Sequence, residues 1–128
     1  MWLESIEAKN VRVSDLVYLS DDEKKGVTQL LDFITYYLKL TFEAILYGSK
    51  ARGDYTIDSD IDLIIISDSF TSPKLKNELI INVRKINKTN NILLSPRIAT
   101  INDLNNPCKY GGTFKQNVIT DGKFIINI

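Results

Sequence analysis

Two short apolar runs, separated by a polar segment, constrain the fold more than any other feature of the chain. They are FEAILYG at residues 42–48 and IDLIIIS at residues 61–67, and each is typical of a buried strand. Three aspartates, Asp58, Asp60 and Asp62, stand at alternate positions where the second run begins. Carboxylates at the mouth of a buried strand are unfavourable unless a cation compensates their charge. The segment therefore predicts a site for a positively charged ligand at the end of a sheet.

Helical periodicity flanks these strands on both sides. Ser20 and Glu23 form an S-x-x-E capping box, and the apolar residues after it recur at helical spacing. A second amphipathic helix is predicted over residues 72–91, with Ser72 as its N-cap and Pro73 at the first helical position.

The remaining segments give weaker signals. Residues 10–20 are compatible with either strand or helix. Residues 91–101 predict one strand interrupted at Pro96 or two strands, because proline cannot donate within a central ladder. A short helix is predicted over residues 110–119 and a final strand over residues 123–128. The order of these elements predicts an α/β (α+β) fold, in which helices flank a small mixed β-sheet.

Composition narrows the classes of protein and of site. The chain, residues 1–128, is predicted to form one domain, because it carries no repeat and no linker-like segment. Its 16 basic and 16 acidic residues balance, so net charge favours neither nucleic acid nor a membrane surface. It has no histidine and one cysteine, Cys108, which excludes histidine-based catalysis and an internal disulfide. Oxygen ligands for magnesium, manganese or calcium remain. A cytoplasmic location is expected, since no signal sequence or long apolar run is present.

The residues around the two strand ends suggest phosphate and metal chemistry. Asp60 and Asp62 are predicted to project from one face of the second strand, because residues two apart in a strand point the same way. Neighbouring carboxylates repel each other, and a divalent cation compensates both. Gly48 and Ser49 follow the first strand, where glycine lets a phosphate approach and helix-start amides bind anions. This combination suits a nucleoside triphosphate held with Mg²⁺ and the release of pyrophosphate.

Other charged residues of the segment have less specific interpretations. Asp58 is interpreted as a loop residue, with a spare metal ligand as the alternative. Arg52 either contacts phosphate or pairs with one of the aspartates, and Lys50 is expected to be exposed to solvent. A calcium loop starting at Asp58 is excluded, because Leu63 and Ser69 stand where that motif needs glycine and glutamate.

The segment GSKARGDYTIDSDID, residues 48–62, resembles the Gly-Ser, ten-residue, Asp-x-Asp signature of the DNA polymerase β-like nucleotidyltransferase superfamily. The residues GSKARG and SDIDL within and after this segment, together with the short chain, resemble the minimal nucleotidyltransferases (MNT). Many of these proteins are antitoxins paired with HEPN-domain ribonuclease toxins. The resemblance implies the polymerase β-like fold, with Gly48 and Ser49 at the phosphates of ATP. It implies that Asp60 and Asp62 are the catalytic ligands of Mg²⁺ or Mn²⁺. It also implies transfer of AMP to a hydroxyl, which in the antitoxins is a tyrosine of the toxin.

One departure from the family pattern leaves two hypotheses open. Superfamily members with clear activity usually carry a third carboxylate on a later strand, whereas NILLSPRIAT, residues 91–100, contains no Asp or Glu. Ser95 is the predicted occupant of that position. The first hypothesis is a Mg²⁺-dependent enzyme that transfers AMP or another NMP to a hydroxyl of a protein or a small molecule, with a HEPN toxin as the expected acceptor. The second is a nucleotide-binding antitoxin that acts by occlusion. The sequence leaves the acceptor, the base preference and a homo-oligomeric state open.

Overall fold

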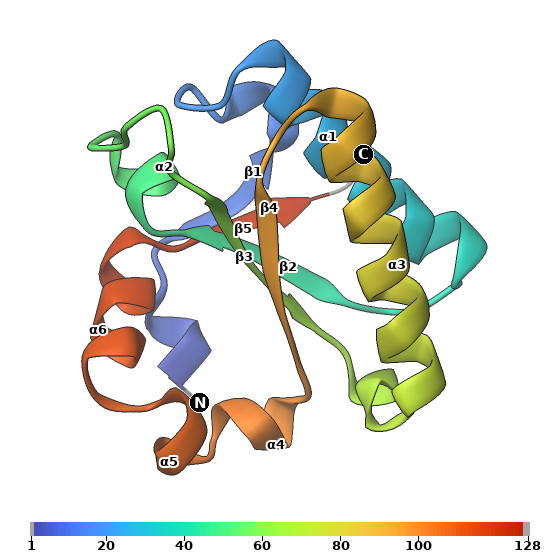
Figure 1. Cartoon of the computed structure of the whole chain (residues 1–128). Helices are drawn as coiled ribbons and strands as arrows, with labels where there is room; N and C mark the ends of the chain where they lie inside the picture. The colour runs from blue at the N-terminus through green and yellow to red at the C-terminus, as the bar shows by residue number, and fades with distance from the viewer. Residues whose placement is uncertain (1, 127–128) are drawn as a thin grey trace.

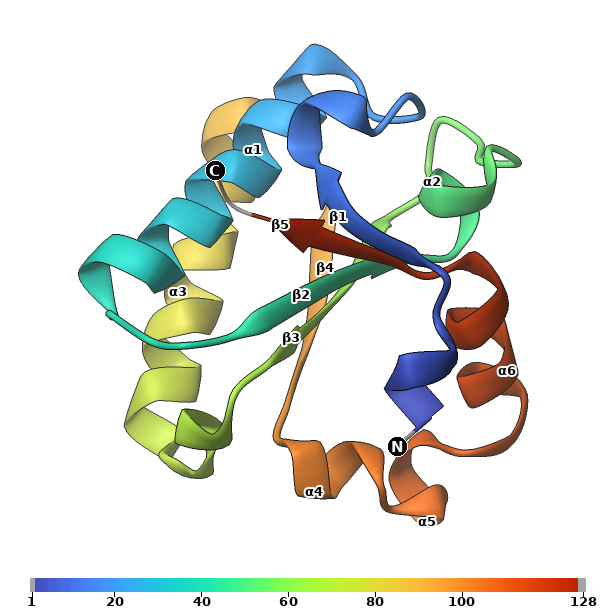
Figure 2. The same ribbon diagram turned by 180° about the vertical axis from the view of Figure 1, so that it is seen from behind.

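The computed structural model describes residues 2–126, whose centre is a five-stranded mixed sheet (Figure 1). The strands are β1 (Ala8–Arg12), β2 (Glu43–Tyr47), β3 (Ile61–Ile66), β4 (Leu94–Ala99) and β5 (Lys123–Ile126). Their order is β1-β5-β2-β3-β4, and the β1–β5 pair, seen from behind in Figure 2, is parallel, as is the β3–β4 pair. β2 is antiparallel to both of its neighbours. The predicted small mixed sheet is therefore confirmed.

Helices cover both faces of the sheet. They are α1 (Asp21–Asp32), α2 (Ser49–Arg52), α3 (Pro73–Asn90), α4 (Ile101–Leu104), α5 (Pro107–Tyr110) and α6 (Gly112–Asp121), joined by the short helical turns η1 (Trp2–Ser5), η2 (Val13–Asp15), η3 (Phe33–Tyr37) and η4 (Asp68–Thr71). α1 and α3 pack on one face, and η1 with α4–α6 lies on the other (Figures 1 and 2).

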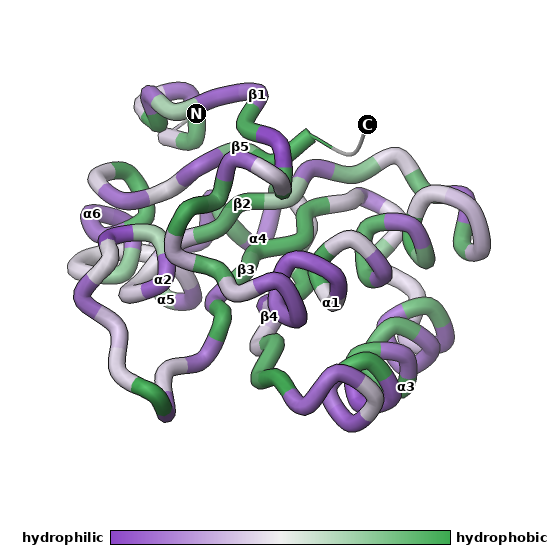
Figure 3. The backbone as a smooth tube through the Cα atoms, turned by 90° about the horizontal axis from the view of Figure 1, so that it is seen from above, coloured by the Kyte–Doolittle hydropathy of each residue, from purple (hydrophilic) through white to green (hydrophobic). Residues whose placement is uncertain are grey.

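The central strands are buried on both faces. Ile61, Leu63 and Ile65 of β3 pack against α1 and α3, whereas Ile64 and Ile66 belong to the second apolar cluster, under α6 and η1. In Figure 3 the tube is accordingly green along much of these strands, whereas along the helices it alternates between purple and green. Burial on both faces explains why the two apolar runs lack the alternation of a half-exposed strand.

The predicted helix starts are confirmed by their hydrogen bonds. Ser20 Oγ accepts from the Glu23 amide at 3.1 Å, and Glu23 Oε1 accepts from the Ser20 amide at 2.9 Å. Ser72 caps α3, which has Pro73 as its first residue, and Asn91 ends that helix with a left-handed φ of 53°. The local sequence thus defines both long helices.

The weaker segments resolve in ways that depend on tertiary position. Within residues 10–20, β1 ends at Arg12 and the turn η2 follows. β4 is one continuous strand through Pro96, because it lies at the edge of the sheet, where a missing donor is tolerated. The short helix expected at residues 110–119 is present as α6, which begins and ends two residues later, whereas α4 and α5 were not predicted. Residues 127–128 of the expected last strand lie outside the described residues. Within residues 2–126, no helix is both long and apolar enough to cross a bilayer.

Candidate functional site

The site begins with a row of three residues across the sheet. Asp62 on β3 has Tyr47 of β2 and Ser95 of β4 as its Cα partners, so all three share one face. Asp62 is half-buried on this face, and Asp60, exposed, directly precedes β3 instead of lying within it. The strand therefore holds one carboxylate rigidly and places the other at its entry.

Gly48 connects this row to α2. Its φ of 79° and ψ of −158° turn the chain out of β2. Residues other than glycine rarely adopt this backbone conformation. A Cβ at this position would lie 2.5 Å from Asp62 Oδ2. Glycine is thus required by the close approach of the carboxylate itself, a reason that the sequence did not reveal. Ser49 begins α2 directly beside it.

The two carboxylates lie close enough for the charge of one to act on the other. Burial raises the pKa of Asp62, and the neighbouring Asp60 charge raises it further, while Arg97 and Arg52 oppose the shift. Within residues 2–126, neither Asp60 nor Asp62 takes part in an ion pair. Two carboxylate groups, completed by phosphate and water oxygens, fit the ligand set that Mg²⁺ usually takes from proteins. Asp60 and Asp62 could therefore hold one such ion together with a triphosphate.

No further carboxylate joins this pair. The described part of the chain contains no group of three or more acidic, histidine or cysteine side chains placed to share a metal. Asp58 is exposed in the connecting loop, which agrees with its interpretation as a loop residue. Ser95 lies beside Asp62, at the position predicted for the missing third carboxylate.

Arg52 connects the loop after α2 to α6. Its Nη1 donates to Asp121 of α6 at 2.9 Å, and its Nε donates to Asp54 at 3.1 Å. It therefore pairs with these two aspartates and with neither carboxylate of the candidate metal pair. Its contact with phosphate stays a prediction.

The expectation for Lys50 was wrong. This side chain is buried, its Nζ lies 3.1 Å from Glu23 Oε2, and it stands 4.0 Å above the Tyr55 ring centroid. Glu23 is the capping-box residue of α1, so the ion pair ties the start of α1 to α2. Burial is possible because the charge has a partner, which a local sequence pattern cannot show.

Arg97 and Tyr47 are site residues that the sequence prediction missed. Arg97 Nε donates to Tyr47 Oη at 3.1 Å, and the guanidinium lies 4.9 Å from the Phe114 ring centroid. Burial raises the pKa of Tyr47, against the opposing effect of Arg97. Arg97 stands two residues after Ser95, so it projects from the same face as Asp62. Aligning β4 parallel to β3 would have revealed this signal.

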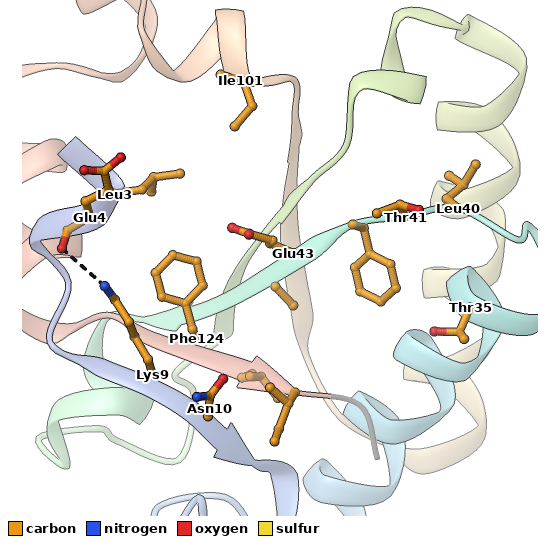
Figure 4. A pocket seen from close by; sticks show the side chains of 14 residues that line it. Leu3, Glu4, Lys9, Asn10, Thr35, Leu40, Thr41, Glu43, Ile101 and Phe124 are labelled. Carbon is orange, nitrogen blue, oxygen red and sulfur yellow. Dashed lines mark hydrogen bonds between the residues drawn. The ribbon is translucent and has the colours of Figure 1, made fainter. Parts of the chain in front are cut away.

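A separate groove lies at the opposite ends of the strands. It has a volume of about 780 Å³, and Figure 4 shows Glu43 and Phe124 among its lining side chains. Glu43 pairs with Ile66, at the far end of β3 from Asp62. The groove is therefore distinct from the carboxylate site.

Comparison with known families agrees with this geometry. The model of the nucleotidyltransferase domain family matches residues 27–109, which is more than half of the chain and includes all of the site residues described above except Glu23, Phe114 and Asp121. The chain therefore belongs to the nucleotidyltransferase domain family.

Individual relatives share a shorter region. Two proteins of Methanocaldococcus jannaschii, "Putative protein adenylyltransferase MJ0604" and "Putative protein adenylyltransferase MJ0141", are 40% identical over 48 residues and 39% identical over 54 residues. These matches cover 37% and 42% of this chain and 48% and 54% of the relatives, so the chain spans about half the length of the curated relatives it matches. A crystal structure described as a putative nucleotidyltransferase from Sulfolobus solfataricus matches with a TM-score of 0.46 and 16% identity, over 81% of this chain and 78% of that one.

Proposed function

We propose that this protein is a Mg²⁺-dependent adenylyltransferase that moves AMP from ATP to a hydroxyl group of a protein partner. The observation that carries the proposal is the carboxylate pair Asp60 and Asp62, of which Asp62 is packed against the glycine turn at Gly48. The adenylyl group and the protein acceptor are supported by the names of the two curated relatives.

The residues divide the chemistry between them. Asp60 and Asp62 would hold the ion, which would supply positive charge to the triphosphate when bound. Gly48 and Ser49 position the phosphates beside them through a close backbone approach and a hydroxyl donor. The acceptor oxygen forms a bond to the α-phosphorus, and the bond from that phosphorus to the bridging oxygen breaks. Pyrophosphate leaves with the electron pair, and the hydroxyl proton passes to solvent.

We propose a helical HEPN-domain protein as the partner, in an antitoxin role. This proposal is supported by the resemblance of GSKARG and SDIDL to the minimal nucleotidyltransferases. A second candidate function is neutralisation by binding alone, favoured by the lack of a third carboxylate within residues 2–126. Co-expression with a HEPN protein in the presence of α-³²P-ATP separates the two: a labelled partner indicates transfer, and an unlabelled complex indicates occlusion.

The metal and nucleotide site is tested by calorimetry of ATP binding with and without Mg²⁺. We expect Asp60→Asn/Asp62→Asn to abolish metal-dependent binding while the fold survives, and the control Asp58→Asn to bind like the parent. Ser49→Ala should weaken binding by roughly 5- to 30-fold, the loss of one charge-assisted hydrogen bond. Unchanged ATP affinity in the double variant would remove these carboxylates from the site.

A further inference from the structure

The carboxylates of the site provide for one divalent ion. Two-metal phosphoryl transfer stabilises both the attacking and the leaving oxygens, and each ion needs its own ligands. In the described part of the chain, Asp60 and Asp62 have no third acidic residue beside them. On the β4 side of Asp62, the sheet instead presents Ser95 and, two residues further, Arg97.

Arg97 is held in place in a way that suits a ligand-binding cation. Tyr47 Oη accepts from its Nε, and its Cζ lies over the Phe114 ring, 4.9 Å from the centroid. Within residues 2–126 its terminal N–H groups make no hydrogen bond, and the side chain is exposed. A guanidinium fixed at one end and open at the other is well suited to bind phosphate oxygens.

The charge of Arg97 also acts on the site. It lowers the pKa of Asp62, against the effects of burial and of Asp60. Gly48 and Ser49 approach Asp62 from the β2 side, and Arg97 belongs to the strand on the other side. A phosphate held over Asp62 would therefore lie between the glycine turn and the guanidinium.

We propose that the site works with a single divalent ion and that Arg97 supplies the second positive charge by binding an oxygen of the α-phosphate. The inference rests on the proposed function, since it assumes that ATP binds at Asp60 and Asp62. Fixed arginine groups and metal ions serve the same purpose in phosphoryl transfer, because both neutralise charge that develops on the transferred group. Tyr47 is then a positioning residue that keeps the guanidinium over the sheet.

The metal count gives the first test. Mn²⁺ binding is measured by electron paramagnetic resonance with saturating α,β-methylene-ATP, which cannot release pyrophosphate. We expect one Mn²⁺ per protein in the parent and in Arg97→Met. Two ions per protein in the parent would overturn the inference.

Nucleotide affinity gives the second test, by calorimetry with the same analogue. Arg97→Met should weaken binding roughly 10- to 100-fold, as expected for one lost hydrogen bond to a charged group, and Arg97→Lys should retain part of the affinity. Tyr47→Phe should have a smaller effect. The matched control is Arg84→Met, which removes the same charge from an exposed position on α3. If Arg97→Met does not fold, Arg97→Gln is measured in its place.

The outcomes separate the two levels of the proposal. A parent that binds the analogue with metal, together with an Arg97 variant that binds it equally well, overturns the role of Arg97 alone. A parent without metal-dependent binding overturns the proposed function and this inference together.

Discussion

The connection between β2 and β3 carries charge at both of its ends, and the two ends use it differently. At the first end, Lys50 is buried but meets Glu23 at 3.1 Å. At the second end, burial raises the pKa of Asp62, and the like charge of Asp60 raises it further. The first arrangement is complete within the chain, so it contributes to folding. Within residues 2–126 the second has no ion-pair partner, and this absence is what the proposed cation would compensate.

The first test of this comparison removes the cation from the ion pair between Lys50 and Glu23. Lys50→Met leaves Glu23 without its partner where little solvent reaches, with side-chain exposures of 9% for Lys50 and 13% for Glu23. We expect a loss of about 2–3 kcal/mol in the free energy of unfolding, measured with urea.

A matched variant shows whether the unpaired charge of Glu23 causes this loss of stability. Lys50→Met/Glu23→Gln removes that charge and keeps a side chain that can cap α1, because glutamine also serves in a capping box. It should recover at least about 1 kcal/mol of the loss. A double variant as unstable as Lys50→Met would mean that packing, and not charge, decides this end of the connection.

The second test separates backbone strain from the crowding of Asp62. Gly48→Ala combines a positive φ with a Cβ that lies 2.5 Å from the carboxylate, and we expect it to lower the free energy of unfolding by about 2 kcal/mol. Gly112→Ala is the control, because its φ is also positive, at 60°, but no atom lies within 4 Å of the added Cβ. It should lose about 1 kcal/mol. Equal losses in urea unfolding would show that Asp62 moves aside without cost.

These contrasts also explain what the sequence could predict. The capping box at Ser20 depends on neighbouring residues, so a local pattern was sufficient for it. The burial of Lys50 depends on a partner 27 residues away, and no local rule identifies it.

The same limit applies to the second side of the site. The Arg97–Tyr47 contact joins residues 50 positions apart, and it requires the parallel register of β4 on β3. Strand existence is encoded locally, whereas register follows from the packing of the whole sheet. The position of the two carboxylates at the start of β3 was therefore predictable, and the contact of the guanidinium was not.

The last test, with the smallest expected effect, asks whether the carboxyl groups of Asp62 and Asp103 favour or oppose folding. It uses metal-free protein in the presence of a chelator. Burial and Asp60 raise the pKa of Asp62, so this carboxyl favours the folded state only while protonated, and the stabilisation is lost as pH rises through the folded pKa. The amide of Thr100 and the ammonium of Lys109 lower the pKa of Asp103, so its stabilisation is present at neutral pH and is lost as pH falls through the folded pKa.

At pH 7, Asp62→Asn should therefore stabilise the fold by about 0.5 kcal/mol, while Asp103→Asn should destabilise it by about 0.5–1 kcal/mol. Urea unfolding at pH 7 and at pH values below the ordinary carboxyl pKa of 3.8 measures both, and the Asp62 gain should vanish at the lower pH. A loss of stability in Asp62→Asn at pH 7 would show that its carboxylate has a favourable partner within the fold, and the contrast with Lys50 would then disappear.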